Sequence, residues 1–204
     1  MNYYIDFDNT LYNTPLLTDR LLNSIVNSII KKTNLDSKNL YEECKSMFNQ
    51  DLCHIKLAKY FSAKYNLDTP TIINNLNNIL LNGYDLVFDD VIPFLERLKE
   101  KGHKLYMLTY SKHSLEYQSI KIAGSKLSDY FNTLYITSVP KYNLDIDYEN
   151  GIFIDDNPTD LLGLYSKKAK QVIRLRRKDN KHSIKDIKQN NIQEYFSLNE
   201  ITII

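Results

Sequence analysis

The segment YIDFDNT, residues 4–10, leads from an apolar run into two aspartates, and it decides the expected fold. A second acidic cluster, DDNPTD at residues 155–160, follows the apolar run GIFI at residues 151–154. An aspartate at the end of a strand lies in the crevice where open α/β sheets bind ligands. Several carboxylates in one crevice repel each other unless a divalent cation lies among them, and oxygen-only ligands suit Mg²⁺. The two strand ends therefore predict a magnesium site.

Helical periodicity fills the region that follows the first strand. Apolar residues recur at helical spacing between residues 15 and 87, which predicts an all-helical insertion. In its last helix Thr69 is the candidate N-cap, Pro70 suits the first helical position, and Gly83 is expected to end the helix in a left-handed turn.

The remainder of the chain alternates between helices and strands. A helix through residues 92–98 is expected to stop at Gly102, before a buried strand at residues 104–109. Further strands are predicted at 133–137, 151–154 and 171–175, separated by helices near 113–122 and 158–168. With the first strand, these make five parallel strands in an α/β core formed by residues 1–14 and 88–204.

Three short motifs in this order resemble the haloacid dehalogenase superfamily. Its first signature, Asp-x-Asp-x-Thr after a strand, matches Asp6, Asp8 and Thr10, while Thr109 matches the second motif and residues 155–160 the fourth. The resemblance implies a Rossmann-like parallel sheet with a small helical cap, here residues 15–87, that closes over the crevice and helps to select the substrate. It also implies Mg²⁺-dependent phosphoryl chemistry, since members that dehalogenate generally lack the second aspartate, which is Asp8 here.

The resemblance gives the two aspartates of the first motif separate roles. Asp6 is implied as the nucleophile and a metal ligand, and Asp8 as the general acid/base that also binds metal through its backbone carbonyl. In a strand, alternate residues point the same way, so both aspartates can reach a ligand while Phe7 turns inward. An Asx-turn is the structural alternative. A calcium loop is excluded, because Leu11 stands where it needs glycine and Leu17 where it needs a carboxylate.

Phosphate-binding residues are implied by the second and third motifs. Thr109 is expected to bind a phosphate oxygen, although Tyr110 follows it where the family often has asparagine. The third motif is a lysine that holds the nucleophile and the phosphate together, and Lys141 is the first choice, with Lys112 as the alternative. The family often shows Lys-Pro, whereas Pro140 precedes Lys141 here. Either lysine could also be a solvated surface residue.

The fourth motif has both a metal-binding and a structural interpretation. Asp156 and Asp160 have the Asp-x-x-x-Asp spacing of the family, so Asp156 is the expected metal ligand, with Asp155 assisting. The same residues also suit a helix start, with Asn157 as N-cap, Pro158 in the first position and Asp160 as the partner in a capping box. Both interpretations can hold together, because a helix N-terminus favours anionic ligands.

Composition limits the possible partners and the cellular location. The 204 residues include 26 Lys and Arg and 25 Asp and Glu, so no net charge attracts the protein to nucleic acids or membranes. The basic segment at residues 167–188 is interpreted as the solvated face of a helix and loop, with a site for a polynucleotide or another acidic partner as the alternative. The apolar stretch at residues 21–30 is too short and too polar to span a bilayer. Cys44 and Cys53, with no zinc spacing and no signal segment, favour the cytoplasm.

The expected function is therefore Mg²⁺-dependent hydrolysis of a small phosphorylated metabolite through an aspartyl-phosphate. Two alternatives remain open: a non-catalytic protein of the same fold that binds a partner, and a phosphotransferase or mutase. The clustered carboxylates argue against a non-catalytic protein, because a scaffold that binds no metal gains no stability from carboxylates that repel one another. The sequence does not specify the substrate or the oligomeric state.

Overall fold

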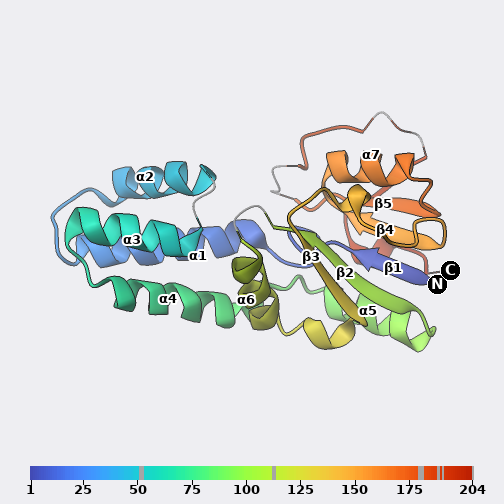
Figure 1. Cartoon of the computed structure of the whole chain (residues 1–204), viewed down its shortest axis with the longest axis horizontal. Helices are drawn as coiled ribbons and strands as arrows, with labels where there is room; N and C mark the ends of the chain where they lie inside the picture. Colours follow the sequence, from blue (N-terminus) through green and yellow to red (C-terminus); the bar gives the residue numbers. More distant parts are fainter. Residues whose placement is uncertain (51–52, 112–113, 179–181, 188, 190, 204) are drawn as a thin grey trace. The chain divides into compact units, whose positions relative to one another are not determined.

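One parallel β-sheet organises the part of the chain that carries the motifs. The computed structural model describes residues 1–50, 53–111, 114–178, 182–187, 189 and 191–203. In this part of the chain, six parallel strands form one sheet in the order β3-β2-β1-β4-β5-β6 (Figure 1). The strands are β1 (Asn2–Ile5), β2 (Lys104–Tyr110), β3 (Thr133–Thr137), β4 (Gly151–Asp155), β5 (Gln171–Leu175) and β6 (Gln193–Tyr195). The predicted α/β class is confirmed.

Burial and register of the central strands determine where the motifs lie. All five residues of β4 are buried, as expected for a strand in the middle of a parallel sheet that is covered on both faces. In the register, Ile5 pairs with Met107 on one side and with Ile154 on the other. Because β1, β2 and β4 are parallel and their ends are aligned in register, the residues that follow them come together at one edge of the sheet.

Helices α5 (Val91–Glu100) and α7 (Pro158–Ser166) cover opposite faces of the sheet (Figure 1). The strand order explains this, because the chain moves in one direction from β1 to β2 and in the other from β4 to β5, and right-handed crossovers then lie on opposite faces. Gly102 has a φ of +73°, so α5 ends in the left-handed turn that the sequence predicted.

Aromatic rings fill the core beside the central strands. The Tyr4 ring stacks on Phe153 from β4, with centroids 4.7 Å apart, and on Tyr106 from β2, with centroids 4.8 Å apart. Leu161 and Leu164 of α7 are buried in the same cluster. This packing joins the three central strands and α7, so their carboxyl ends have a rigid base.

The structure divides into two compact units. The core unit comprises Met1–Asn13, Val87–Tyr110 and Lys126–Ile204, and the helical unit comprises Thr14–Leu86 and Ser111–Ser125. The sequence placed the boundaries of the helical region at residues 15 and 87, and it assigned the helix near 113–122 to the core. The structure differs on that helix, since α6 (Leu115–Ser125) belongs to the helical unit. Its Gly124 lies against the backbone of α4, a contact that sequence periodicity does not reveal.

Within the described residues, the helical unit consists of α-helices and one 3₁₀ turn. Its elements are α1 (Thr14–Ile30), α2 (Ser37–Asn49), α3 (His54–Tyr65), α4 (Thr69–Leu81), η1 (Gly83–Leu86) and α6. Apolar residues on α1 and α4 face the interior of the unit, which agrees with the predicted periodicity. In the described part of the chain, no helix combines the length and the apolar character needed to cross a bilayer.

Two details of α4 correct the sequence prediction. The N-cap is Asp68, not Thr69, because the Asp68 carboxylate accepts a hydrogen bond from the Thr71 amide. The helix ends at Leu81, with Asn82 as C-cap, and Gly83 begins η1 without a positive φ. Both errors have one cause: neighbouring residues of similar capping tendency compete, and only the backbone geometry selects among them.

Strand β6 was not predicted at all. It has only three residues, and its sequence, Gln-Glu-Tyr, has none buried. A strand at the edge of a sheet needs no apolar run, so hydrophobic patterning could not indicate it. The short turns η2 (Ser128–Tyr130), η3 (Lys141–Asn143) and η4 (Leu198–Glu200) complete the core unit within the described residues.

We expect Gly124→Ala to destabilise the protein by about 1–3 kcal/mol, the usual cost of overpacking a tight contact. A Cβ at this position would lie 1.9 Å from the carbonyl oxygen of Leu80, a backbone atom that cannot move aside alone. Urea unfolding followed by circular dichroism measures the change. The control Ser119→Ala, at an exposed position of α6, should stay within about 0.5 kcal/mol of wild type. Equal stability of Gly124→Ala and wild type would contradict the close packing of α4 and α6.

Candidate active site

The first motif forms a strand end followed by a tight turn. Asp6 comes directly after β1, and its amide donates a hydrogen bond to the Ile154 carbonyl at 2.9 Å, which fixes it beside β4. The sequence interpretation required the strand to continue to Asp8, but β1 ends at Ile5. Instead, the amides of Leu11 and Tyr12 both donate to the Phe7 carbonyl at 3.0 Å and close a turn. Phe7 is buried as predicted, whereas Asp8 lies half-buried in the turn.

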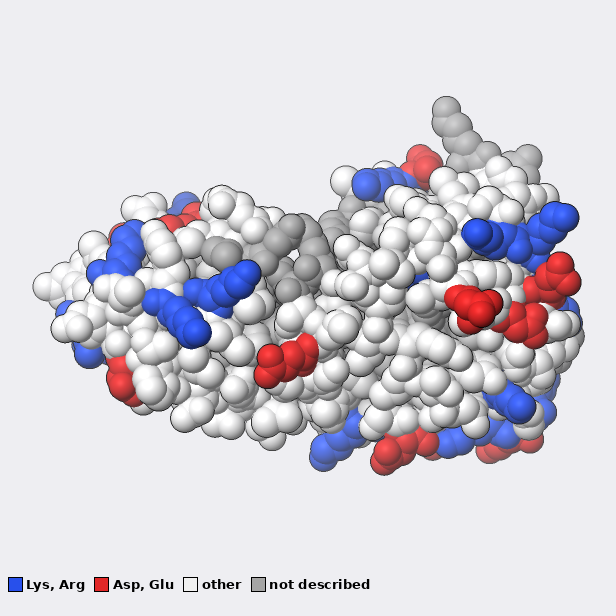
Figure 2. Space-filling model, in the orientation of Figure 1, with Lys and Arg blue, Asp and Glu red and all other residues white. Residues whose placement is uncertain are grey.

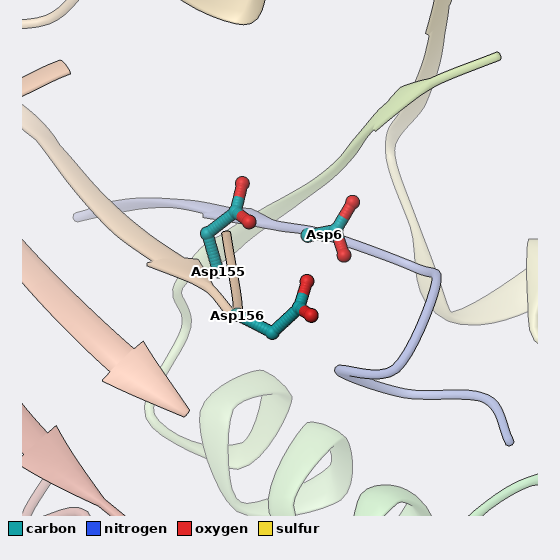
Figure 3. A group of neighbouring side chains, drawn as sticks. All are labelled: Asp6, Asp155 and Asp156. Atoms are coloured by element: carbon teal, nitrogen blue, oxygen red, sulfur yellow. The ribbon is translucent and has the colours of Figure 1, made fainter. Parts of the chain in front are cut away.

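Three carboxylates from two strand ends meet in one place. Asp6, Asp155 and Asp156 are all buried, and each offers an oxygen within 4.8 Å of the others. Figure 3 shows the three carboxylates directed toward a common space at the ends of β1 and β4. Residues about 150 positions apart in the sequence are thus brought together, as the parallel register requires. Asp8 does not belong to this group of three side chains.

Lys141 joins two of these carboxylates from a third element. Its ammonium donates to Asp6 Oδ1 at 2.5 Å and to Asp155 Oδ2 at 2.7 Å, and only 2% of the side chain is exposed. The residue begins η3, directly after Pro140. The alternative lysine, Lys112, lies outside the described residues. The solvated interpretation of Lys141 is wrong, because a buried lysine with two carboxylate partners is part of the cluster.

Burial and like charges act on the ionisation of this cluster. Burial raises the pKa of Asp6 well above its usual range; the Lys141 cation opposes this, whereas Asp155, Asp156 and Asp8 add to it. Burial alone would lower the pKa of Lys141, but Asp155 and Asp6 raise it, so the lysine remains an ammonium at neutral pH. One cation therefore faces three carboxylates, and the cluster carries an excess of negative charge.

The residues after Asp156 begin α7 and support the cluster at the same time. The Asn157 side chain accepts a hydrogen bond from the Thr159 amide at 3.1 Å, which makes Asn157 the N-cap, and Pro158 opens the helix, both as predicted. The Asn157 amide donates to Asp155 Oδ1 at 2.9 Å, so the N-cap also orients an aspartate of the cluster.

Asp160 connects the helix start to the cluster. It accepts a hydrogen bond from the Asn157 side-chain amide at 2.8 Å, in place of the backbone contact that a capping box makes. Burial raises the pKa of Asp160, as does the nearby Asp155, while Lys141 lowers it. The carboxylate thus holds the N-cap side chain and adds to the negative field around Lys141.

Thr109 occupies the predicted strand end. It is the second-last residue of β2, fully buried, and two positions beyond Met107, which pairs with Ile5. Tyr110 after it is exposed. Thr109 therefore lies at the same edge of the sheet as Asp6.

The donor set of the cluster fits a hard divalent cation. It offers carboxylate oxygens only, and three of them lie close enough to share one ion. In the nearby turn, and among the described residues, Asn9 Oδ1 and Thr10 Oγ1 are buried side-chain oxygens with no hydrogen-bond partner. Buried polar atoms of this kind usually have a water, an ion or a ligand as partner. We therefore assign Asp6, Asp155 and Asp156 as residues able to hold Mg²⁺.

The basic segment near the C-terminus is only partly a solvated face. Arg174 is 1% exposed and lies in β5, and Arg177 is 8% exposed just beyond it, so both are buried residues of the core unit. A run of charges in sequence did not distinguish them from their exposed neighbours. Acidic and basic side chains lie interspersed among uncharged residues on the face of the molecule shown in Figure 2.

Comparison with known proteins identifies the family. The chain matches the family described as haloacid dehalogenase-like hydrolase over residues 4–172, which is most of its length. A search of curated proteins gave no match. The matched range includes all residues that the sequence interpretation assigned to the site.

Solved structures of low sequence identity share the fold. A haloacid dehalogenase-like hydrolase from Burkholderia xenovorans has a TM-score of 0.70 at 15% identity, covering 97% of this chain and 92% of its own. A HAD phosphatase from Thermococcus onnurineus has a TM-score of 0.63 at 18% identity, with coverage of 98% and 94%. The HAD-hydrolase YfnB from Bacillus subtilis, bound to magnesium, has a TM-score of 0.63 at 13% identity, with coverage of 98% and 95%. Other similar structures include an L-2-haloacid dehalogenase and a protein from Thermotoga maritima assigned as a β-phosphoglucomutase.

Replacing Lys141 by methionine should lower the free energy of unfolding by about 3–5 kcal/mol at pH 7 in the presence of chelator. The change leaves buried carboxylates without their cation. Since Lys141 opposes the upward shift of the Asp6 pKa, that pKa rises further above its unfolded value in the variant. The deficit should then shrink as the pH falls through the raised pKa, because proton binding neutralises the folded state. Urea unfolding at pH 7 and pH 5 measures both effects.

Lys104→Met, which removes an exposed lysine from β2, is the matched control and should change stability by no more than about 0.5 kcal/mol. A Lys141→Met protein as stable as this control at pH 7 would contradict the buried ion pairs.

Proposed function

We propose that the chain, which belongs to the haloacid dehalogenase-like hydrolase family, is a Mg²⁺-dependent phosphatase that acts on a small phosphomonoester. The observation that carries the proposal is the buried cluster of Asp6, Asp155 and Asp156 with Lys141 bridging two of its carboxylates. Three carboxylates held close together around one ammonium are costly to bury in a purely structural role. They suit a site that receives further positive charge together with an anionic substrate.

In the proposed reaction Asp6 is the nucleophile. One carboxylate oxygen of Asp6 forms a bond to phosphorus, and the ester P–O bond of the substrate breaks. The leaving oxygen takes a proton from the carboxyl group of Asp8, which becomes a carboxylate. The product alcohol then departs and leaves a phosphoryl group on Asp6.

The second half of the reaction regenerates the enzyme. The Asp8 carboxylate removes a proton from a water molecule, whose oxygen attacks phosphorus and breaks the bond to Asp6. Inorganic phosphate leaves, Asp6 is again a carboxylate and Asp8 is again protonated. Asp8 lies outside the three-carboxylate group yet near enough to raise the Asp6 pKa, a position that suits a proton carrier acting beside the nucleophile.

Residues around Asp6 are proposed to stabilise the negative charge of the phosphoryl group. Lys141 orients Asp6 and presents an ammonium on which phosphoryl oxygens can rest, and Thr109 is proposed to donate its hydroxyl to one of those oxygens. Bound by Asp6, Asp155, Asp156 and the Asp8 carbonyl, Mg²⁺ would supply charge that offsets both the clustered carboxylates and the phosphoryl oxygens. A relative of this fold is titled as bound to magnesium, which supports the assignment.

The presence of Asp8 favours phosphoryl transfer over dehalogenation, the activity named for another protein of the fold. Dehalogenation needs no proton donor for its halide leaving group, whereas an alkoxide leaving group does. A phosphotransferase or mutase, like the similar protein titled a β-phosphoglucomutase, would use the same cluster with a second hydroxyl in place of water. Product analysis with and without acceptor alcohols separates the two reactions.

Cys44 and Cys53 are free thiols, which supports a reducing compartment such as the cytoplasm. The helical unit, Thr14–Leu86 with Ser111–Ser125, is proposed to be the cap that the family resemblance implies.

The variant Asp6→Asn should lower phosphate release by at least about 10³-fold, because the amide cannot act as the nucleophile. A panel of phosphorylated metabolites and one aryl phosphate is assayed with Mg²⁺ and with chelator. Asp129→Asn, at an exposed carboxylate of the core unit, should behave as wild type. Full activity in a folded Asp6→Asn protein would refute the nucleophile assignment.

The variant Asp156→Ala should raise the Mg²⁺ concentration for half-maximal activity by about 10-fold or more, since even residues that only support metal ligands cost 10–100-fold. Titration of activity with Mg²⁺ measures the shift, and Glu149→Ala, at an exposed acid, serves as control. An unchanged Mg²⁺ requirement in Asp156→Ala would transfer the ligand role to Asp155.

A further inference from the structure

We infer that Arg177, paired with Asp90, is a positioning residue that holds the turn carrying Asp8 in its reactive place. The inference rests on the proposed function, in which Asp8 transfers the proton. It assigns a role to a buried arginine that the sequence presented only as part of a basic run. All the residues involved belong to the core unit.

The turn after Asp6 is closed by its own backbone hydrogen bonds, and the Phe88 amide also donates to its Leu11 carbonyl from outside at 3.2 Å. Its internal bonds run from the amides of Leu11 and Tyr12 to the Phe7 carbonyl, and from the Asn9 amide to the Tyr12 carbonyl. Asn9 has a φ of +59°, in the left-handed region that asparagine adopts more readily than most residues with a side chain. The hydrogen bonds on either side of Asn9 keep its backbone in this conformation.

Arg177 adds a side-chain anchor to the turn from beyond the end of β5. Its Nε and Nη2 donate to the Thr10 carbonyl at 3.2 and 3.0 Å, so one backbone oxygen of the turn accepts two hydrogen bonds from the same guanidinium. The guanidinium also lies over the Phe88 ring, 4.3 Å from its centroid. A planar guanidinium that lies over a ring and donates two hydrogen bonds to one carbonyl has little conformational freedom. It therefore fixes the position of the Thr10 carbonyl in the turn.

Asp90 fixes the other side of the guanidinium. Arg177 donates to both oxygens of Asp90 at 2.6 and 2.7 Å, a bidentate pair. The Ser197 hydroxyl and the Leu198 amide donate to Asp90 Oδ2 at 2.6 and 2.9 Å. Burial works against ionisation of Asp90, but hydrogen bonds from Arg177 and Ser197 outweigh it and lower its pKa. Asp90 is the N-cap residue of α5, but its side chain makes no capping hydrogen bond, so its carboxylate serves this network instead.

The consequence concerns Asp8 more than Asp6. Asp6 has its own anchors, the Ile154 carbonyl and Lys141, whereas Asp8 lies within the turn that Arg177 holds. Loosening the turn should therefore impair proton transfer to the leaving group and spare the nucleophile. The rate of hydrolysis should fall least for a substrate whose leaving group needs no proton.

The test is Arg177→Lys, assayed as kcat/KM on 4-nitrophenyl phosphate and on the best alkyl phosphate of a substrate panel. Lysine keeps the charge but loses the fork that reaches Asp90 and Thr10 together. We expect kcat/KM to fall about 100-fold for the alkyl phosphate and less than about 5-fold for the nitrophenyl ester. Asp8→Asn should show the same contrast between substrates. Equal losses on the two substrates would overturn the inference.

Arg174→Lys is the matched control. Arg174 is a buried arginine of β5, three residues before Arg177, with hydrogen bonds to Glu194 and to the carbonyls of His182 and Lys185. Replacing Arg174 should destabilise the fold to a similar extent, but it leaves the hydrogen bonds to the Thr10 carbonyl intact. We expect this variant to lose stability but to show no contrast between the two substrates. The same contrast in Arg174→Lys would reduce the effect at Arg177 to general destabilisation.

Hydrogen exchange provides a readout that needs no activity. The amides of Leu11 and Tyr12, which close the turn, should exchange about 10-fold faster or more in Arg177→Lys than in Arg174→Lys, while amides of β1 stay unchanged. If wild type hydrolyses no phosphate ester, the proposed function fails, and this experiment still decides the positioning role. Unchanged exchange at Leu11 and Tyr12 would refute it.

A second variant covers the case in which Arg177→Lys does not fold. Asp90→Asn leaves Arg177 present but weakens its bidentate pairing with residue 90. It should give the same contrast between substrates and the same direction of exchange, with smaller amplitude. Wild-type exchange in the turn of a folded Asp90→Asn protein would contradict the coupling between Asp90 and Thr10.

Discussion

The buried ammonium of Lys141 between Asp6 and Asp155 is the interaction on which the site depends. Without it, three carboxylates from β1 and β4 would repel one another in a region from which water is largely excluded. With it, they remain an anionic cluster that is stable enough to fold and still in need of further positive charge. The same imbalance that makes the cluster costly for folding makes it suitable for a divalent cation and a phosphorylated ligand.

The parallel sheet explains why such a cluster can form. Because β1, β2 and β4 are parallel and in register, the residues after Ile5, Met107 and Ile154 meet at one edge, although long segments separate them in the chain. Aromatic packing of Tyr4 against Phe153 keeps the strands together beneath that edge. Two buried charged contacts then act at that edge: Lys141 orients Asp6, and Arg177 binds the turn that follows.

Sequence patterns predicted the elements whose residues have a periodic or local signature. The central strands, the helix starting at Asn157-Pro158 and the end of α5 at Gly102 were correct, because apolar runs and capping residues carry their own signal. The site residues Asp6, Asp155 and Asp156 were brought together as expected. Strand β6, the membership of α6 in the helical unit and the burial of Arg177 were missed, since each depends on contacts between residues distant in sequence. The extension of the strand to Asp8 was wrong, because the turn closes on Phe7 instead.

The most direct test of the account is to trap the phosphoryl group on the enzyme. A single turnover with a substrate found active in the presence of Mg²⁺ is quenched in acid within milliseconds, and the digested protein is mapped by mass spectrometry. The account predicts one phosphoryl group on the N-terminal peptide, located at Asp6, whose signal vanishes as turnover is completed. A phosphoryl group on another residue, or turnover with no labelled Asp6 at any quench time, would contradict the central claim.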